Sequence, residues 1–214
     1  MKQSSYILNW GNSLLEMLPS RALFLPQKNA ILICDIHLGK GEYFQQNGIP
    51  LTNYSDEKNL LRIRNIVQKY NPNKLIILGD LFHSKYSISK SLKSKVEILS
   101  ENLNIEIQLI AGNHDKGCEV KNITFLDNKK FQNLIFTHEP LDKQKDNVLN
   151  ICGHYHPKIY LRNSKDKLSF PCFAMDESKN ILYMPAFGDL TGGYPCKKSF
   201  KKWAIISEKK IIKV

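Results

Sequence analysis

Two histidines stand one residue apart in the stretch ICGHYHPK, residues 151–158. If the backbone there is extended, His154 and His156 point to the same face, because alternate residues of a strand share a face. Two neighbouring imidazoles repel each other when protonated and gain little when neutral, unless a cation lies between them. The pair therefore predicts half of a metal site whose other ligands lie elsewhere in the chain.

Four further polar clusters could supply the missing ligands. Each follows a short apolar run, and with the first pair they contain all six histidines of the chain. One such cluster alone is usually a turn or a hydrogen-bonded polar residue, but five in order favour one shared site. The clusters are CDIHLGK, GDLFHS, GNHD and FTHEP, and their chemically active residues are Asp35, His37, Asp80, His83, Asn113, His114, Asp115 and His138.

The donor set combines carboxylates, an amide and imidazoles without any thiolate. Such a set fits divalent Mn, Fe or Zn better than Ca or Mg. Seven ligands are too many for one ion, whereas two ions that share a carboxylate would use them all, as in two-metal sites that cleave phosphate esters. We expect two divalent ions, Mn²⁺ first, with Fe or Zn as alternatives. The candidate ligands are Asp35, His37, Asp80, Asn113, His138, His154 and His156.

The clusters need a scaffold that brings their loops together. Apolar runs rich in β-branched residues predict buried strands that end at the clusters, within residues 30–35, 74–80, 105–115, 133–139 and 148–156. Between them, one helix is predicted from an N-cap at Ser55 and another along Leu92, Val96, Leu99 and Leu103. In open α/β sheets the binding crevice lies at the carboxyl ends of the strands. The pattern therefore predicts that five loops meet at one crevice.

Length and composition set the broad class. With 214 residues, 42% of them hydrophobic, we expect a single domain over residues 1–214, of α/β class with sheets packed as a sandwich. The five cysteines show no C-x-x-C spacing, which disfavours a disulfide framework or a zinc ribbon and suits a reducing cytoplasm. The absence of an apolar run of membrane-spanning length predicts a soluble cytoplasmic protein without a membrane partner.

The charge is strongly basic. The formal net charge is +11 and the sequence pI is about 9.3. Between Lys197 and Lys213 seven lysines stand against one acid, with Phe200 and Trp203 interleaved. Clustered lysines neutralise phosphates and release counterions, but a lysine-rich surface also serves solubility alone. Composition leaves both interpretations open.

The ordered set D-x-H, G-D-x-x-H, G-N-H-D, H and G-H-x-H over residues 35–156 resembles the calcineurin-like metallophosphoesterase superfamily. The resemblance implies a four-layer α-β-β-α sandwich and a metal-dependent phosphoesterase. It implies that Asp80 bridges the two metals and that His114 stands beside the leaving group. It also implies a first metal held by Asp35, His37 and His156, and a second held by Asn113, His138 and His154.

Flanking segments suggest a narrower group. The stretches ALFLP, DIHLGKGEYFQQNGIP and MPAFGDLTGG are similar to the ligase-associated DNA-damage-response endonuclease family (PdeM), whose members are encoded with a DNA ligase and a helicase-like protein. This similarity implies DNA as substrate, a role in DNA repair, and functional association with those two partners. His83 supports a nuclease-like branch, because Ser/Thr protein phosphatases carry Arg there within G-D-x-V-D-R-G.

The expected reaction is in-line attack of a metal-bridging hydroxide on a phosphodiester. His114, oriented by Asp115, would stabilise developing charge or protonate the leaving group, which is typically worth about 10²- to 10⁴-fold. His83 would contact the substrate phosphate or instead orient Asp80. Lys40, Gly192 and Gly193 are candidate substrate contacts, with a solvated lysine and a plain turn as the alternatives.

Two other functions stay open. The same ligands would serve a small-substrate phosphoesterase, namely a cyclic-nucleotide phosphodiesterase, a nucleotide pyrophosphatase or a phosphomonoesterase. A non-enzymatic scaffold is disfavoured, because no ligand is missing. Open access to the crevice would favour DNA, and a helical cap over it would favour a small molecule. The sequence does not define the oligomeric state.

Overall fold

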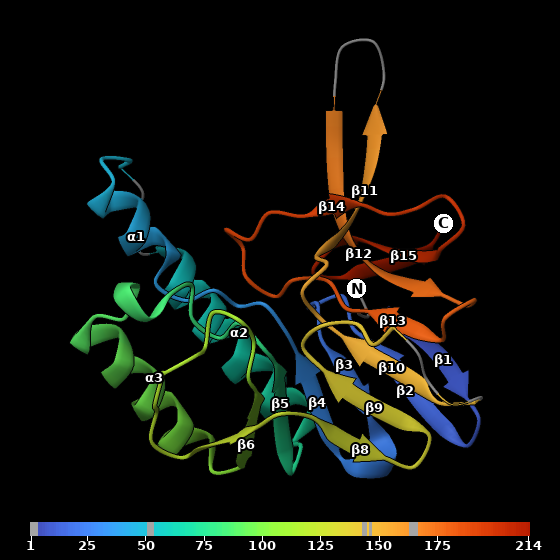
Figure 1. Cartoon of the computed structure of the whole chain (residues 1–214), viewed down its shortest axis with the longest axis horizontal. Coiled ribbons are helices and arrows are strands. Elements are labelled where there is room, and N and C mark those ends of the chain that lie inside the picture. Colours follow the sequence, from blue (N-terminus) through green and yellow to red (C-terminus); the bar gives the residue numbers. More distant parts are fainter. Residues whose placement is uncertain (1–3, 51–53, 143–144, 146, 163–166) are drawn as a thin grey trace.

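The computed structural model describes residues 4–50, 54–142, 145, 147–162 and 167–214 as two sheets packed face to face (Figure 1). The first sheet follows chain order from β1 to β7. It is antiparallel from β1 to β4 and parallel from β4 to β7. Its strands are β1 (Tyr6–Trp10), β2 (Ser13–Met17), β3 (Leu23–Leu25), β4 (Ala30–Ile33), β5 (Lys74–Leu78), β6 (Glu106–Ile110) and β7 (Ile123–Leu126).

The second sheet is built from the rest of the chain in the order β14-β11-β12-β13-β10-β9-β8, with β15 beside β12 and β16 beside β15. Only β9, β10 and β13, and the pair β11 and β14, run parallel. Its strands are β8 (Lys129–Phe131), β9 (Leu134–Thr137), β10 (Leu149–Cys152), β11 (Pro157–Arg162), β12 (Lys167–Asp176), β13 (Ile181–Tyr183), β14 (Tyr194–Pro195), β15 (Lys201–Ser207) and β16 (Lys210–Lys213).

Helices α2 (Tyr54–Tyr70) and α3 (Lys90–Leu103) cover the outer face of the first sheet, while α1 (Lys40–Gln46) projects above them (Figure 1). Short 3₁₀ turns lie at Pro26–Lys28 and Lys85–Ser87. The predicted helical face of α3 is buried, and Ser89 caps this helix by accepting the Leu92 N–H at 3.1 Å. No helix among the described residues is both long and apolar enough to cross a membrane.

The predicted N-cap of α2 is wrong. This helix already includes Tyr54, so Ser55 lies in its first turn rather than before it. The Ser55 hydroxyl is buried without a hydrogen-bond partner, whereas a capping hydroxyl would accept an N–H of that turn.

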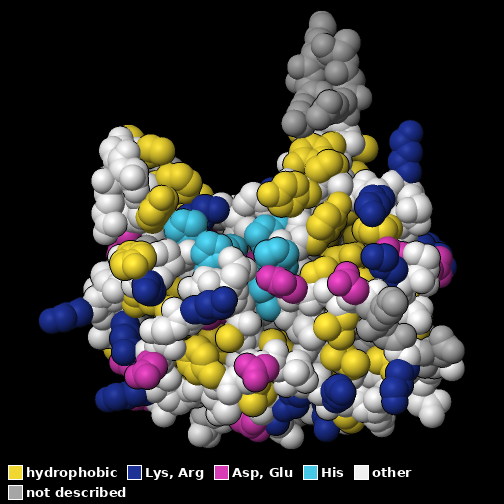
Figure 2. Space-filling model, in the orientation of Figure 1, with side chains coloured by type: hydrophobic (Ala, Val, Ile, Leu, Met, Phe, Trp, Pro, Cys, Tyr) yellow, Lys and Arg dark blue, Asp and Glu magenta, His cyan; other side chains and the backbone are white. Residues whose placement is uncertain are grey.

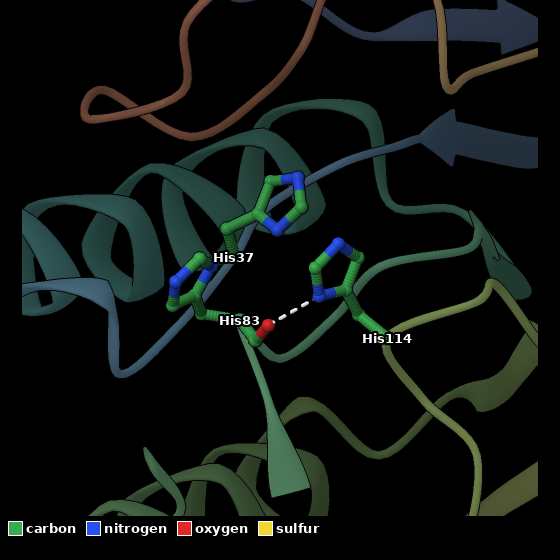
Figure 3. A group of neighbouring side chains, drawn as sticks. All are labelled: His37, His83 and His114. Carbon is green, nitrogen blue, oxygen red and sulfur yellow. Dashed lines mark hydrogen bonds between the residues drawn. The ribbon is translucent and has the colours of Figure 1, made fainter. Parts of the chain in front are cut away.

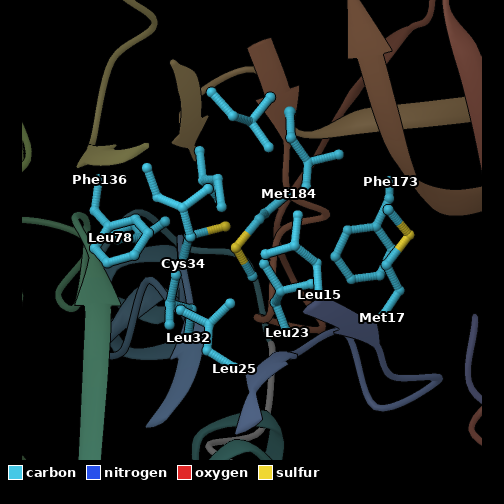
Figure 4. Packing of buried hydrophobic residues seen from close by; sticks show 14 of the residues in the cluster. Leu15, Met17, Leu23, Leu25, Leu32, Cys34, Leu78, Phe136, Phe173 and Met184 are labelled. Atoms are coloured by element: carbon cyan, nitrogen blue, oxygen red, sulfur yellow. The ribbon is translucent and has the colours of Figure 1, made fainter. Parts of the chain in front are cut away.

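The main core lies between the two sheets and is apolar (Figure 4). In β4, Leu32 faces this core, while Ile31 and Ile33 face the helices. This alternation explains the continuous apolar run, because a strand covered on both faces has no polar side. Residues of the inter-sheet core include Leu15, Met17, Leu23, Cys34, Leu78, Phe136, Phe173 and Met184.

The predicted α/β class with packed sheets is confirmed, but its fourth layer differs. In the described part of the chain no helix covers the outer face of the second sheet. Tyr155, Cys196 and Phe200 pack there instead. Most of this sheet's strands are joined by short turns and loops, such as the one between Asp176 and Ile181, which leave too little chain for a helix.

Candidate metal centre

The five predicted clusters converge on one cavity. They leave the carboxyl ends of β4, β5 and β6 in the first sheet and of β9 and β10 in the second. The resulting hollow has a volume of about 500 Å³, and histidines form its floor in Figure 2. A cavity of about 530 Å³ near β8 and β9 is lined by no histidine. The first cavity is lined by His37, Lys40, Asp80, His83, Asn113, His114, His154, His156, Thr191, Gly192, Gly193 and Tyr194.

One ligand group consists of Asp35, His37 and His156, with ligand atoms within 4.8 Å of one another. Asp35 is fully buried, and its Oδ1 lies 3.0 Å from His156 Nε2. Burial acts to raise the pKa of Asp35, but hydrogen bonding to His156 and the nearby charges outweigh it and hold this pKa below its usual value. The carboxylate is therefore ionised at neutral pH.

The surroundings of His37 give the clearest sign that the site fits a cation. Both of its ring nitrogens are buried without a hydrogen-bond partner. Burial is the main cause that lowers its pKa to about 3, so the ring is neutral and keeps a lone pair. Buried polar atoms normally have partners, and a divalent ion is a partner that these nitrogens fit.

The second ligand group consists of Asp80, His138 and His154. A third set of close donor atoms, His37, His83 and His114, contains no carboxylate. His138 Nδ1 lies 3.0 Å from the Leu78 carbonyl, which only accepts, so the proton of a neutral ring sits on Nδ1. Nε2 then turns its lone pair toward Asn113 Oδ1 at 3.2 Å and Asp80 Oδ2 at 3.5 Å. The same Nε2 lies 3.1 Å from His154 Nδ1. A carboxylate, an amide oxygen and two imidazole nitrogens thus converge on one point, and this donor set fits a divalent cation.

Asp80 lies between the two groups. Its Oδ2 is 3.7 Å from His37 Nε2 on one side and 3.5 Å from His138 Nε2 on the other. Its Oδ1 accepts the backbone N–H of His114 at 3.1 Å. Burial raises the pKa of Asp80, assisted by Asp35 and opposed by His138. Asp35 and Asp80 are both buried carboxylates, and a bound cation would offset the repulsion between their charges.

The backbone is left-handed at five of these positions. The φ angles are 51° at Asp35, 50° at His37, 53° at Asp80, 61° at His154 and 48° at His156. The predicted extended run through His156 is therefore wrong, because β10 ends at Cys152 and tight turns follow. Both histidines nevertheless line the cavity. Such conformations cost about 1–3 kcal/mol each and cluster at functional sites.

Two glycines make room for the carboxylates. A Cβ atom at Gly112 would collide with the Asp80 side chain, and one at Gly153 would collide with that of Asp35. This close approach explains the glycines of the G-N-H-D and G-H-x-H clusters.

The side chain of Asp115 does not have the predicted role of orienting His114. Its carboxylate is 1% exposed and accepts the backbone N–H groups of Asp80 at 2.7 Å, Gly112 at 2.9 Å, Leu81 at 3.0 Å and Phe82 at 3.3 Å. It joins the loop after β6 to the loop after β5 and so fixes both halves of the site. It does not orient the His114 ring, because its oxygens turn toward these amides.

The partner of the His114 ring is the His83 backbone, since His114 Nδ1 contacts the His83 carbonyl (Figure 3). The two rings stack at a centroid distance of 5.6 Å, and His37 stands edge-on at 5.2 Å from His114. Burial, Lys40 and His114 lower the pKa of His83 to about 4. Among the described residues no contact joins the His83 ring to Asp80, so its predicted alternative role of orienting Asp80 gains no support.

The rim brings further residues to the cavity. Lys40, Gly192 and Gly193 line it as expected for substrate contacts, and Thr191 and Tyr194 do so unpredicted. The signal for these two was the segment MPAFGDLTGG, whose turn continues into Tyr194. The Thr191 hydroxyl anchors this rim by donating to the Asp35 carbonyl at 3.3 Å.

The lysine-rich segment lies elsewhere. None of its described lysines lines the cavity. Lys201 pairs with Glu177, and Lys202 Nζ donates to the carbonyls of Lys197 and Lys198. Lys40 is the basic side chain that lines the cavity, and Arg21 and Lys158 line the adjoining hollow.

Comparison with known proteins gives a family and a fold. The family described as calcineurin-like phosphoesterase matches residues 29–205. The nuclease MPE from Pseudomonas putida has a similar structure, with a TM-score of 0.80, 24% identity, and coverage of 99% of this chain and 100% of that one. Yfce, a phosphoesterase from E. coli, gives a TM-score of 0.44 at 14% identity, covering 86% and 97%. No curated protein sequence matches the chain.

Proposed function

The chain belongs to the calcineurin-like phosphoesterase family and is a metal-dependent phosphoester hydrolase, and we propose that it cleaves phosphodiester bonds of DNA. The observation that carries this proposal is the position of the two ligand groups at the floor of an open hollow (Figure 2). A polymer can cross such a hollow, whereas a site for small molecules is usually enclosed.

In this proposal Asp35, His37 and His156 hold one divalent ion, and Asn113, His138 and His154 hold the other. Asp80 is shared by both. When bound, such ions polarise the phosphate and lower the pKa of a water molecule, Mn²⁺ being the metal we favour over Fe and Zn. The buried, unpartnered ring nitrogens of His37 and the side chains that converge on His138 Nε2 support the assignment.

His114 is the residue proposed to act on the leaving group. Its Nδ1 donates to the His83 carbonyl, since a carbonyl only accepts. Nε2 is thus the atom free to exchange a proton, and it lies at the cavity, 4.0 Å from Asp80 Oδ2. His83 keeps the stacked ring in place and, with a lowered pKa, presents a neutral imidazole to the substrate phosphate.

Two projections flank the hollow and support a nucleic-acid substrate. Figure 2 shows apolar side chains on both, one formed by α1 and the other by the β11–β12 hairpin. Tyr43 on one side is 40% exposed and Tyr194 on the other is 63% exposed, and exposed aromatic rings can stack on bases. The +11 charge and the similarity in fold to a nuclease agree with this substrate.

The proposal is tested with purified protein and Mn²⁺ on four substrates. These are bis-p-nitrophenyl phosphate, p-nitrophenyl phosphate, a cyclic nucleotide, and single-stranded or nicked DNA. We expect cleavage of the simple diester and of DNA, little release from the monoester, and loss of all activity with a chelator. Rapid hydrolysis of the cyclic nucleotide or the monoester with DNA left intact would instead establish a small-substrate phosphoesterase.

Lys40 is expected to contribute to DNA binding through one phosphate contact. It lines the cavity, where burial is the main cause that lowers its pKa and the nearby Lys158 acts in the same direction. The Lys40→Gln variant should reduce the slope of log K against log salt by about 0.7 for single strands or about 0.9 for duplex DNA. Binding measured by anisotropy at several salt concentrations gives this slope.

The matched control is Lys201→Gln, which removes an exposed lysine that pairs with Glu177 outside the cavity. We expect its salt slope to stay close to that of the parent protein. A larger change in this control than in Lys40→Gln would place the DNA path over the lysine-rich segment instead.

A further inference from the structure

Two cysteine thiols touch each other beside the rim of the cavity. Cys172 lies on β12, and Cys196 follows directly after β14. Their Sγ atoms are 3.4 Å apart. The side chains of Cys34, Cys118 and Cys152 are buried, whereas Cys196 is partly exposed. This pair therefore combines contact with access from solvent.

The surroundings of the pair make the two sulfurs unequal. Cys172 is the more buried of the two thiols, and either sulfur can donate in their contact. Hydrogen bonding from Cys172 is the main cause that lowers the pKa of Cys196, and the nearby Lys202 acts in the same direction. A partly exposed thiol with enhanced thiolate character next to a second thiol is the arrangement of a reactive cysteine with a resolving partner.

We propose that Cys172 and Cys196 form a reversible disulfide when the protein meets a peroxide. The Cys196 thiolate attacks one peroxide oxygen, which breaks the O–O bond and gives a sulfenic acid and one water after protonation. The Cys172 sulfur then displaces the sulfenic oxygen as a second water, and the S–S bond forms. Two thiols are oxidised by two electrons, and one peroxide is reduced to two waters.

Closing the bond requires little movement. A disulfide has an S–S length of about 2.05 Å, so the sulfurs must approach by roughly 1.3 Å. The segment that carries Cys196 is tied to the metal centre, because the Tyr194 N–H donates to the His156 carbonyl at 3.1 Å and the Tyr155 hydroxyl donates to the Pro195 carbonyl at 2.8 Å. The disulfide would thus fasten the rim at Tyr194 to β12.

The test uses the full chain treated with stoichiometric hydrogen peroxide. Remaining thiols are alkylated, and the protein is digested and mapped by mass spectrometry. We expect one cross-linked peptide pair containing Cys172 and Cys196, lighter by two hydrogen atoms than the reduced pair and reversed by dithiothreitol. The oxidised protein should also melt a few degrees higher, since the new link constrains the unfolded chain.

Variants make the assignment specific. Cys172→Ser and Cys196→Ser should each abolish the cross-link, while Cys118→Ser should retain it. Peptide mapping of the unmodified sequence gives the answer even if a serine variant fails to fold. Direct oxidation of Cys196 to the sulfinic acid without any cross-link would overturn the proposal, as would a cross-link to another cysteine. Neither readout depends on which substrate the enzyme cleaves.

Discussion

Replacing Asp80 by asparagine is expected to lower turnover at least ~10²-fold and to release at least one metal ion per chain, because bound metal contributes several kcal/mol to catalysis. The side chain lies 3.7 Å from His37 and 3.5 Å from His138, between the two ligand groups. Asparagine keeps the size and the oxygen that accepts the His114 N–H, but it loses the negative charge that two cations would share. Metal content by mass spectrometry and turnover of bis-p-nitrophenyl phosphate measure the two effects.

The stability of the metal-free variant separates this explanation from misfolding. Burial and Asp35 raise the pKa of Asp80, so the native structure disfavours its charge when no cation is bound. The metal-free Asp80→Asn protein should therefore melt no lower than the metal-free parent, in line with the strain that functional sites carry. Asp127→Asn, which neutralises an exposed acid outside the site, should keep both metal and activity. Full metal content in Asp80→Asn would contradict the bridging role.

Much of the fold could be predicted from the pattern of apolar residues. A strand that is buried on both faces is apolar throughout, and a helix that is buried on one face is apolar at every third or fourth residue. The run AILICD contains β4, and the spacing of Leu92, Val96 and Leu99 marks the buried face of α3. The outer face of the second sheet could not be predicted in this way. Phe200 covers that face from an irregular segment, and irregular packing has no period.

The candidate site, like the fold, could be predicted only in part. Residue types and their order at strand ends were enough to predict one shared cavity, since the carboxyl ends of neighbouring strands meet at one edge. They could not predict the left-handed turns at His154 and His156, because a local turn is decided by what the loop packs against. The contact between Cys172 and Cys196 could not be predicted either, because it joins a strand residue to a loop residue 24 positions along the chain, and no local spacing encodes that approach.

His114→Ala should lower the rate of DNA cleavage by about 10²- to 10⁴-fold while both metal ions stay bound, because the residue is proposed to transfer a proton rather than to coordinate. The contact of Nδ1 with the His83 carbonyl leaves Nε2 for this transfer. The backbone N–H that holds Asp80 Oδ1 is retained in alanine. Loss of metal in this variant would identify His114 as a ligand.

The choice of leaving group makes the test sharper than activity alone. An alkoxide released from DNA needs a proton as the bond breaks, whereas p-nitrophenolate leaves readily without one. If His114 is a general acid, alanine should therefore harm DNA cleavage much more than hydrolysis of bis-p-nitrophenyl phosphate. His114→Gln provides the matched variant, because its amide can still donate a hydrogen bond but cannot give up a proton, so it should show the same selective loss. Equal losses on both substrates, with activity restored by glutamine, would mean that His114 stabilises charge on the phosphate through a hydrogen bond and does not protonate the leaving group.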